Sequence, residues 1–441
     1  MDTNEQRQES QQNRREERHK RRQRSQIIAY TVVGIMILVL AAGIAFAVSK
    51  ITGMSHNRQE QQNKLDDIIA SEETITAPTE SVETVPELTN EQKLDKIIDE
   101  AIIQNMPLED KVAGLFITTP ESITGVSAAV QAGDGTKDAL SKYPVGGIVY
   151  AAKNIQSADQ LKQMIDNTKL YTSYPLFIAI DGEGSGTDAV AAAGLGTKTD
   201  SPETIGASGD TNNAYTAGTT VGSYLAELGF NLDFAPAADL KVVDGNAAGS
   251  SSYGTDATTV ASFVTGMQTG LQEQKVTAAI GHFPGIGSTT QSTKNGMAST
   301  DRSAEDFRAN EFAVFQSCID SGETQMITVS NMAAPSLTGD NTPCSFSSAV
   351  VTDILRNELN FRGVIVSGAM NQTAITNYYG ADEAAVLALR AGCDMIYAPE
   401  NFETAYNGVL EAVQNGTISE ERVNDSLRRI YRIKYADKIE Q

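Results

Sequence analysis

The chain has 441 residues, of which 40% are hydrophobic and 20% charged, so most of it can fold around a buried core. A formal net charge of -22 argues against nucleic acid as a partner, because contacts with phosphate require a basic surface. The three histidines are His19, His56 and His282, and the first two fall in segments that read as a tail and a linker. The folded part then has one histidine, which excludes a multi-histidine metal centre, and we expect no cofactor.

The N-terminus begins with a basic tail that is followed by an uncharged apolar run. Residues 1–26 contain eight Lys/Arg and five Asp/Glu, whereas residues 27–48 contain no charged side chain. A helix over these 22 residues would be about 33 Å long, which is enough to cross the core of a bilayer. Because four basic residues lie between positions 20 and 24, we expect the tail in the cytoplasm and the rest outside the cell. The sequence therefore predicts a single-pass signal anchor in the cell membrane at 27–48.

A cleaved signal peptide is the alternative for this apolar run. The residues Ala45, Phe46 and Ala47 are similar to a cleavage site, but the run is long for the apolar part of a signal peptide. The next segment, residues 49–90, is polar, and its second half is rich in Thr, Glu and Pro. That composition cannot bury enough apolar surface to fold, so we predict a disordered extracellular linker at 49–90.

Residues 91–441 alternate short apolar runs with segments of helical periodicity. Eight runs are typical of strands: 112–118, 145–151, 176–181, 230–235, 276–282, 326–330, 364–367 and 394–398. Helical periodicity covers 158–171, 214–228, 257–273, 304–321, 348–360, 383–391 and 419–435. Near-continuous apolar strands are typical of a parallel sheet that helices cover on the outside. The pattern predicts an α/β fold, a (β/α)8 TIM-type barrel, with a doubly wound open sheet as the alternative.

The cysteines of the chain are Cys318, Cys344 and Cys393. They are too few and too far apart in sequence for a disulfide framework. We expect three buried free thiols, and a single bridge that leaves one thiol is the alternative.

Chemistry in such a barrel depends on the loops that follow the strands. Asp181 and Glu183 follow the third predicted strand, Asp239 comes after the fourth, and His282 ends the fifth. Polar side chains therefore gather at neighbouring strand ends, as a binding pocket requires. The structural alternative is that these carboxylates cap helices or bind backbone amides.

Three blocks of the sequence, in order, resemble those of a known enzyme family. They are LGFNLDFAP at 228–236, HFPG at 282–285 and GTISEERV at 416–423. Over residues 95–436 the chain is similar to the bacterial β-N-acetylhexosaminidases of glycoside hydrolase family 3. The resemblance implies the barrel and a site shaped for an N-acetylglucosaminyl residue. It also implies that Asp181, Glu183 and His282 are substrate-binding residues.

The catalytic positions implied by the resemblance carry other residues in this chain. The family's nucleophilic Asp after strand seven is Gly368, its acid/base His is Lys294, and the Asp that orients this His is Ser292. The family's Lys before the His-Phe-Pro-Gly block is Gly281, and its strand-six His is Asn331. Glycine has no side chain, so a covalent glycosyl-enzyme cannot form at position 368.

Two arginines that bind substrate in the family are also replaced in this chain, by Gly186 and Ser251. Lys294 would donate a proton only if burial lowered its pKa by several units, and we expect a solvated loop lysine instead. Loss of a nucleophile and its base costs on the order of 10⁶ in rate. We therefore expect negligible glycosidase activity on an intact fold.

Three hypotheses about function remain open. The first is a membrane-anchored extracellular pseudoenzyme that binds cell-wall glycan or a wall-associated protein. The second is an active β-N-acetylhexosaminidase that hydrolyses terminal N-acetylglucosamine in peptidoglycan-type glycans. The third is a structural interaction module that makes no use of the pocket.

Overall fold

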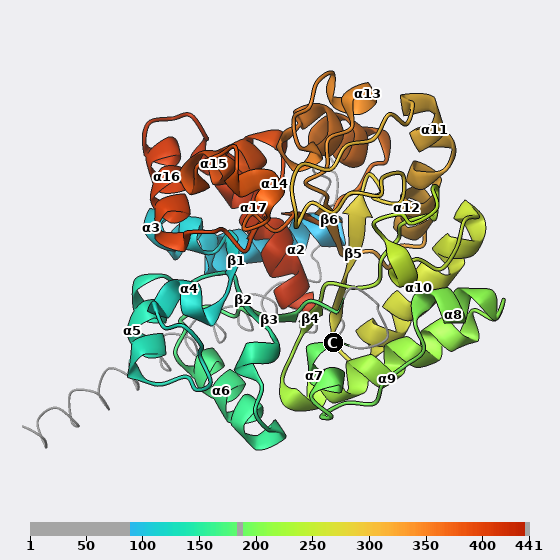
Figure 1. Ribbon diagram of the computed structural model, residues 1–441. Helices are drawn as coiled ribbons and strands as arrows, with labels where there is room; N and C mark the ends of the chain where they lie inside the picture. Colours follow the sequence, from blue (N-terminus) through green and yellow to red (C-terminus); the bar gives the residue numbers. More distant parts are fainter. Residues whose placement is uncertain (1–88, 183–187, 437–441) are drawn as a thin grey trace, which may run out of the picture. The chain divides into compact units, whose positions relative to one another are not determined.

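The computed structural model describes residues 89–182 and 188–436 (Figure 1). The predicted tail, anchor and most of the linker lie outside the described residues, and so does Glu183. Within the described ranges, no helix is both long and apolar enough to cross a membrane.

Eight parallel strands form one sheet in the order β7-β6-β5-β4-β3-β2-β1-β8. They are β1 Phe116–Thr118, β2 Gly147–Tyr150, β3 Phe177–Ile180, β4 Leu232–Asp233, β5 Thr277–Phe283, β6 Met326–Val329, β7 Val364–Ser367 and β8 Ile396–Tyr397. A parallel bridge between Val366 and Met395 joins β7 to β8, so the sheet is a nearly closed barrel. The predicted α/β barrel is confirmed, and the doubly wound open sheet is wrong.

Helices connect the strands and surround the barrel (Figure 1). They are α2 Asn90–Ala101, α3 Leu108–Ala113, α4 Pro120–Thr124, α5 Asp134–Lys142, α6 Ala158–Leu170, α7 Ala189–Ala192, α8 Pro202–Ala207, α9 Asn212–Leu228, α10 Ala257–Glu273, α11 Ala304–Ala309, α12 Glu311–Asp320, α13 Pro335–Thr338, α14 Thr373–Thr376, α15 Ala381–Ala391, α16 Phe402–Gln414 and α17 Glu420–Lys434. Between α13 and β7, Ala349–Glu358 is a π-helix.

The predicted helix at 304–321 is divided into α11 and α12. Asn310 leaves the helical conformation, with φ -125° and ψ -75°. Its side-chain amide donates a hydrogen bond to the Asp306 carbonyl oxygen at 2.9 Å. Asparagine favours helix ends because its side chain competes for backbone partners, which explains the break.

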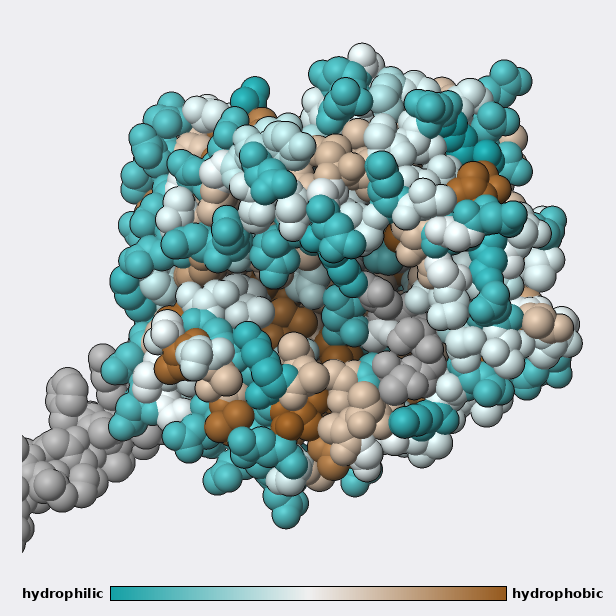
Figure 2. Space-filling model, in the orientation of Figure 1, coloured by the Kyte–Doolittle hydropathy of each residue, from teal (hydrophilic) through white to brown (hydrophobic). Residues whose placement is uncertain are grey.

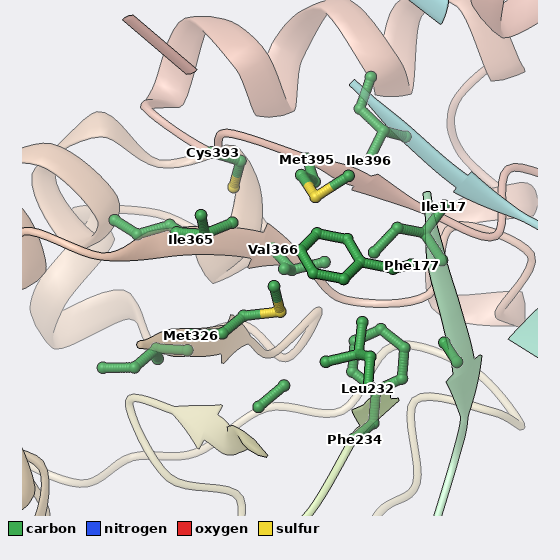
Figure 3. Packing of buried hydrophobic residues seen from close by; sticks show 14 of the residues in the cluster. Ile117, Phe177, Leu232, Phe234, Met326, Ile365, Val366, Cys393, Met395 and Ile396 are labelled. Carbon is green, nitrogen blue, oxygen red and sulfur yellow. The ribbon is translucent and has the colours of Figure 1, made fainter. Parts of the chain in front are cut away.

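The interior of the barrel is filled by apolar side chains from several strands. Figure 3 shows Phe177, Leu232, Met326 and Val366 directed toward one another, and all four are buried. The three cysteines are free and buried, as predicted. The surface shown in Figure 2 is mainly hydrophilic with smaller hydrophobic areas, in keeping with the high net charge. The interior is thus a packed core, and space for a ligand remains at the ends of the strands.

A buried carboxylate connects β8 to the last helix. Asp394 precedes β8 and is 0% exposed. Its partners are the side chains of Arg356 at 2.7 Å, Ser426 at 2.8 Å, Arg429 at 3.0 Å and Arg422 at 3.6 Å, and the amide nitrogen of Ile365 at 2.9 Å. Burial alone would raise the pKa of the Asp394 carboxyl, but the three arginines and the amide outweigh it and hold this pKa below its ordinary value. The carboxylate is therefore charged and shared between several elements.

Candidate functional site

The carboxyl ends of the strands surround a cavity of about 600 Å³. Asp181 after β3, His282 in β5, Gly368 after β7 and Tyr397 in β8 all line it. A cavity of this size, lined by both apolar and polar side chains, is typical of a small-molecule site. Its place at the carboxyl ends of the strands is the usual one for a barrel of this kind.

The site residues chosen from the sequence meet at this cavity wherever the structure describes them. Asp181 and His282 line it, and so do Gly368, Lys294 and Ser292, whereas Glu183 is outside the described residues. The loop with Ser292 and Lys294 is held against α14, because the hydroxyl of Thr373 donates to the Lys294 carbonyl oxygen at 2.8 Å.

His282 is oriented by a buried acid, Asp239. The Asp239 carboxylate accepts a hydrogen bond from Nδ1 of His282 at 2.9 Å through Oδ2, and from the Ile286 amide at 2.8 Å through Oδ1. Because a carboxylate only accepts, Nδ1 of His282 carries the proton in this hydrogen bond. The sequence placed Asp239 at a strand end but did not pair it with His282, since 43 positions separate the two and only the fold brings them together.

The space next to Gly368 is occupied by Asn331. A Cβ atom at Gly368 would lie 2.6 Å from Oδ1 and 2.8 Å from Nδ2 of Asn331, which is too close for a real contact. The Asn331 side chain is fixed there: Nδ2 donates to the Ala369 carbonyl oxygen at 2.8 Å and to Gln372 Oε1 at 3.1 Å, and Oδ1 accepts from Ser345 Oγ at 2.7 Å. Asn331 is 1% exposed, so it has little room to move. Position 368 therefore accepts no side chain unless Asn331 is displaced.

The same arrangement occurs on the other side of β6. A Cβ atom at Gly281 would collide with Oγ1 of Thr328, which belongs to β6. Since β5 and β7 are the two neighbours of β6, the glycines at 281 and 368 face side chains from the same strand and the residues after it. Both positions where the family resemblance implies functional side chains are thus closed by their neighbours.

An aromatic pair crosses the cavity from opposite strands. The rings of Phe234, which follows β4, and Tyr397 in β8 stack with centroids 4.4 Å apart and an interplanar angle of 28°. In the order of eight strands, β4 and β8 are opposite. The Tyr397 hydroxyl donates to Oδ2 of Asp181 at 3.4 Å. This gives the cavity an apolar ring surface beside a carboxylate, which suits a sugar ring with its apolar faces and hydroxyl edge.

The sequence comparison decides the family. A family model described as "Glycosyl hydrolase family 3 N terminal domain" matches residues 108–433. The chain belongs to this family. The resemblance inferred from the three sequence blocks is thereby confirmed.

Curated relatives of this family 3 domain carry the name beta-hexosaminidase. The protein of Nitrosomonas eutropha is 31% identical over 263 residues, which are 58% of this chain and 74% of that relative. Beta-hexosaminidase A of Pseudoalteromonas piscicida is 25% identical over 324 residues, which are 67% of this chain and 54% of that relative. The chain therefore spans about half the length of the second relative.

Solved structures that are similar to this chain carry related names. A family 3 beta-N-acetylglucosaminidase from Paenibacillus sp. is 30% identical with a TM-score of 0.71, and the match covers 76% of this chain and 64% of that one. The beta-N-acetylhexosaminidase from Beutenbergia cavernae is 26% identical with a TM-score of 0.65, covering 74% of this chain and 98% of that one.

The family 3 barrel of this chain contains a second buried acid beneath the loop after β5. Glu311, the first residue of α12, is 1% exposed, and its Oε1 lies 2.6 Å from Nε of Arg302. A Cβ atom at Gly285, whose φ is +123°, would lie 2.8 Å from Cγ of Glu311, so only glycine fits above the acid. Burial, with a smaller contribution from the nearby Asp239, raises the pKa of Glu311 to about 7, although Arg302 opposes this.

Stability should fall as the pH rises through neutrality because of Glu311. The folded state holds a proton on this group up to a pKa of about 7, against an ordinary value of 4.5. The contribution of the protonated Glu311 to the free energy of unfolding is therefore complete below pH 4.5. It is lost as the pH rises from there through about 7, and the total loss is up to about 3 kcal/mol. Thermal unfolding between pH 5 and 8 should show a decline that is smaller in Glu311→Gln. The same change at the exposed Glu400 should leave the decline in place, and equal profiles for all three proteins would contradict this assignment.

Proposed function

We propose that this family 3 domain binds glycan without hydrolysing it. The observation that carries the proposal is the position of the Asn331 carboxamide, which lies where a side chain of residue 368 would begin. Gly368 stands where the family resemblance implies the nucleophilic aspartate, and glycine cannot form a glycosyl-enzyme. Lys294 and Ser292 stand at the implied acid/base pair, so the proton donor and its orienting partner are replaced as well.

The cavity keeps features that support binding. Asp181 and His282 offer hydrogen-bonding groups, and the ring pair of Phe234 and Tyr397 offers an apolar surface. The Asp239 carboxylate fixes the ring of His282, so that little rotational freedom is lost when a ligand binds. The relatives named beta-hexosaminidase and beta-N-acetylglucosaminidase support an N-acetylhexosamine unit as the ligand.

The location and partner that we propose follow from the N-terminal sequence. The uncharged run at 27–48 and the basic residues before it support a single-pass protein of the cell membrane with the barrel outside the cell. The ligand would then be cell-wall glycan, and a wall-associated protein is the alternative partner. The acidic net charge supports the exclusion of nucleic acid.

Isothermal titration of the full chain in detergent micelles tests the proposal. We expect N-acetylglucosamine oligomers to bind to the wild type and to bind about tenfold more weakly to His282→Ala, which loses one oriented hydrogen-bonding group. Arg390→Ala, on an exposed position of α15, is the control and should bind like the wild type. If neither these oligomers nor muropeptides bind at millimolar concentration, glycan recognition is rejected and a protein partner is left.

A further inference from the structure

Two amide side chains that contact each other form part of the cavity wall between β6 and β7. They are Asn331, which follows β6, and Gln372, which precedes α14. Asn331 Nδ2 lies within hydrogen-bonding distance of two oxygen atoms, the Ala369 carbonyl at 2.8 Å and Gln372 Oε1 at 3.1 Å. The wall thus stands beside Gly368, where the family resemblance implies an acidic side chain.

The orientation of these two amides is determined by one backbone group. The Ala369 carbonyl only accepts hydrogen bonds, so the Asn331 atom that faces it must be the nitrogen. The same nitrogen faces Gln372, so Gln372 must turn its oxygen toward Asn331. The remaining oxygen of Asn331 accepts from the Ser345 hydroxyl at 2.7 Å, which agrees with this assignment.

The nitrogen of Gln372 is consequently left on the side away from Asn331. Across residues 89–182 and 188–436 the structure records no acceptor for Nε2 of Gln372, and its side chain is half-buried in the lining of the cavity. An amide nitrogen has two N–H donors, and here they are accessible from the cavity that Gln372 lines. A ligand oxygen would satisfy them.

We propose that Gln372 is a ligand-contact residue that selects an oxygen acceptor, and that Asn331 is the positioning residue that turns its nitrogen into the cavity. A nucleophilic carboxylate at this wall would accept hydrogen bonds from the ligand. The amide nitrogen of Gln372 donates them instead, so the ligand meets donors where the family resemblance implies an acceptor. The ligand group it suits is a carbonyl oxygen, such as that of an N-acetyl substituent, rather than a cationic amine. The inference rests on the proposed glycan-binding function and assigns the residue that determines its specificity.

Binding of two trimers tests the selection. The probes are the N-acetylglucosamine trimer and the glucosamine trimer, which differ in the acetyl carbonyl and in the charge of the amine. We expect the full-length wild type to prefer the acetylated trimer at pH 6, and Gln372→Glu to weaken its binding at least tenfold while the glucosamine trimer binds more tightly. Gln372→Glu preserves the shape of the side chain and replaces the donor by an acceptor.

The neighbouring amide provides the matched control. Asn371→Asp adds the same charge to the same cavity, but Asn371 is exposed and is not bonded to Asn331 in the described structure. The preference of Asn371→Asp should stay within about twofold of the wild type, since its charge is better solvated. In Asn331→Ala, Gln372 is free to rotate, and the preference between the trimers should decrease without a change of charge.

A stability cycle tests the positioning contact without any ligand. The losses in urea midpoint caused by Asn331→Ala and Gln372→Ala should not add in the double variant, because the first change already removes their shared hydrogen bond. Additive losses would overturn the positioning role of Asn331. If the wild type binds the acetylated trimer and Gln372→Glu behaves like Asn371→Asp, the specificity role is wrong while the proposed function stands. If the wild type binds neither trimer, the specificity role is wrong, and if it also fails to bind muropeptides, the proposed function is wrong as well.

Discussion

The full-length chain should hydrolyse a chromogenic N-acetylglucosaminide on the order of 10⁶ times more slowly than an active family 3 hexosaminidase, and Gly368→Asp should not restore the reaction. The new Cβ atom would begin 2.6 Å from Oδ1 of Asn331, so the aspartate enters an overpacked site. Overpacking of this kind costs about 1–3 kcal/mol. We therefore expect the variant to be inactive and to unfold at a lower temperature, and release of the chromophore and a thermal scan measure the two effects.

Two further variants separate the causes of this outcome. Gly368→Ala introduces the steric conflict without a charge and should lose most of the same stability. Gly368→Asp with Asn331→Ala removes the conflict and should recover part of the loss, although Lys294 and Ser292 still leave the reaction without its proton donor. Turnover by the wild type that disappears in Lys294→Ala would reject the proposal of an inactive domain and favour an unorthodox hydrolase.

Replacing Asp394 by alanine should destabilise the barrel by about 3–5 kcal/mol. The change removes a fully buried carboxylate and leaves Arg356 and Arg429 without the group that they share at 2.7 and 3.0 Å. The Ile365 amide and the Ser426 hydroxyl lose their acceptor as well. Urea denaturation followed by circular dichroism measures the loss.

Asp353→Ala is the control for this measurement. Asp353 is exposed on the π-helix, so its replacement should change the free energy of unfolding by no more than about 0.5 kcal/mol. A loss below 1 kcal/mol in Asp394→Ala would mean that the arginines find solvent or other carboxylates, and the buried cluster would then not hold β8 to α17.

The strands were predictable because burial on both faces leaves a local signal. A strand such as β6, Met326–Val329, is buried at every position and reads as a short apolar run. A short apolar run does not fix where a strand begins. Residues 112 and 113 of the first predicted strand belong to α3, Leu108–Ala113, because two apolar residues show no period that distinguishes a helix from a strand. The break at Asn310 was missed for a different reason, since it depends on one side-chain hydrogen bond.

The candidate site was predictable only in part. The rule that functional residues follow the strands, together with the family resemblance, correctly placed Asp181, His282 and Gly368 at one cavity. It could not show that Asp239 holds His282, or that Asn331 fills the room beside Gly368, because both depend on the direction of side chains from distant segments. Tyr397 was missed because it lies in the short strand β8, where an aromatic residue reads as one more apolar core position. Its stacking on Phe234 across the barrel is visible only in the structure.

The glycines at 281 and 368 have an evolutionary consequence. Thr328 and Asn331 occupy the room that side chains at 281 and 368 would need, so a mutation that introduces an acid at position 368 gives a less stable protein before it gives any benefit. On the proposed function, a descendant of this chain would need coordinated changes on β6, in the residues after it and on the neighbouring strands to gain catalysis. On the proposed function, a single mutation back toward hydrolysis is therefore disfavoured, because the packing of β6 and the residues after it makes that mutation destabilising.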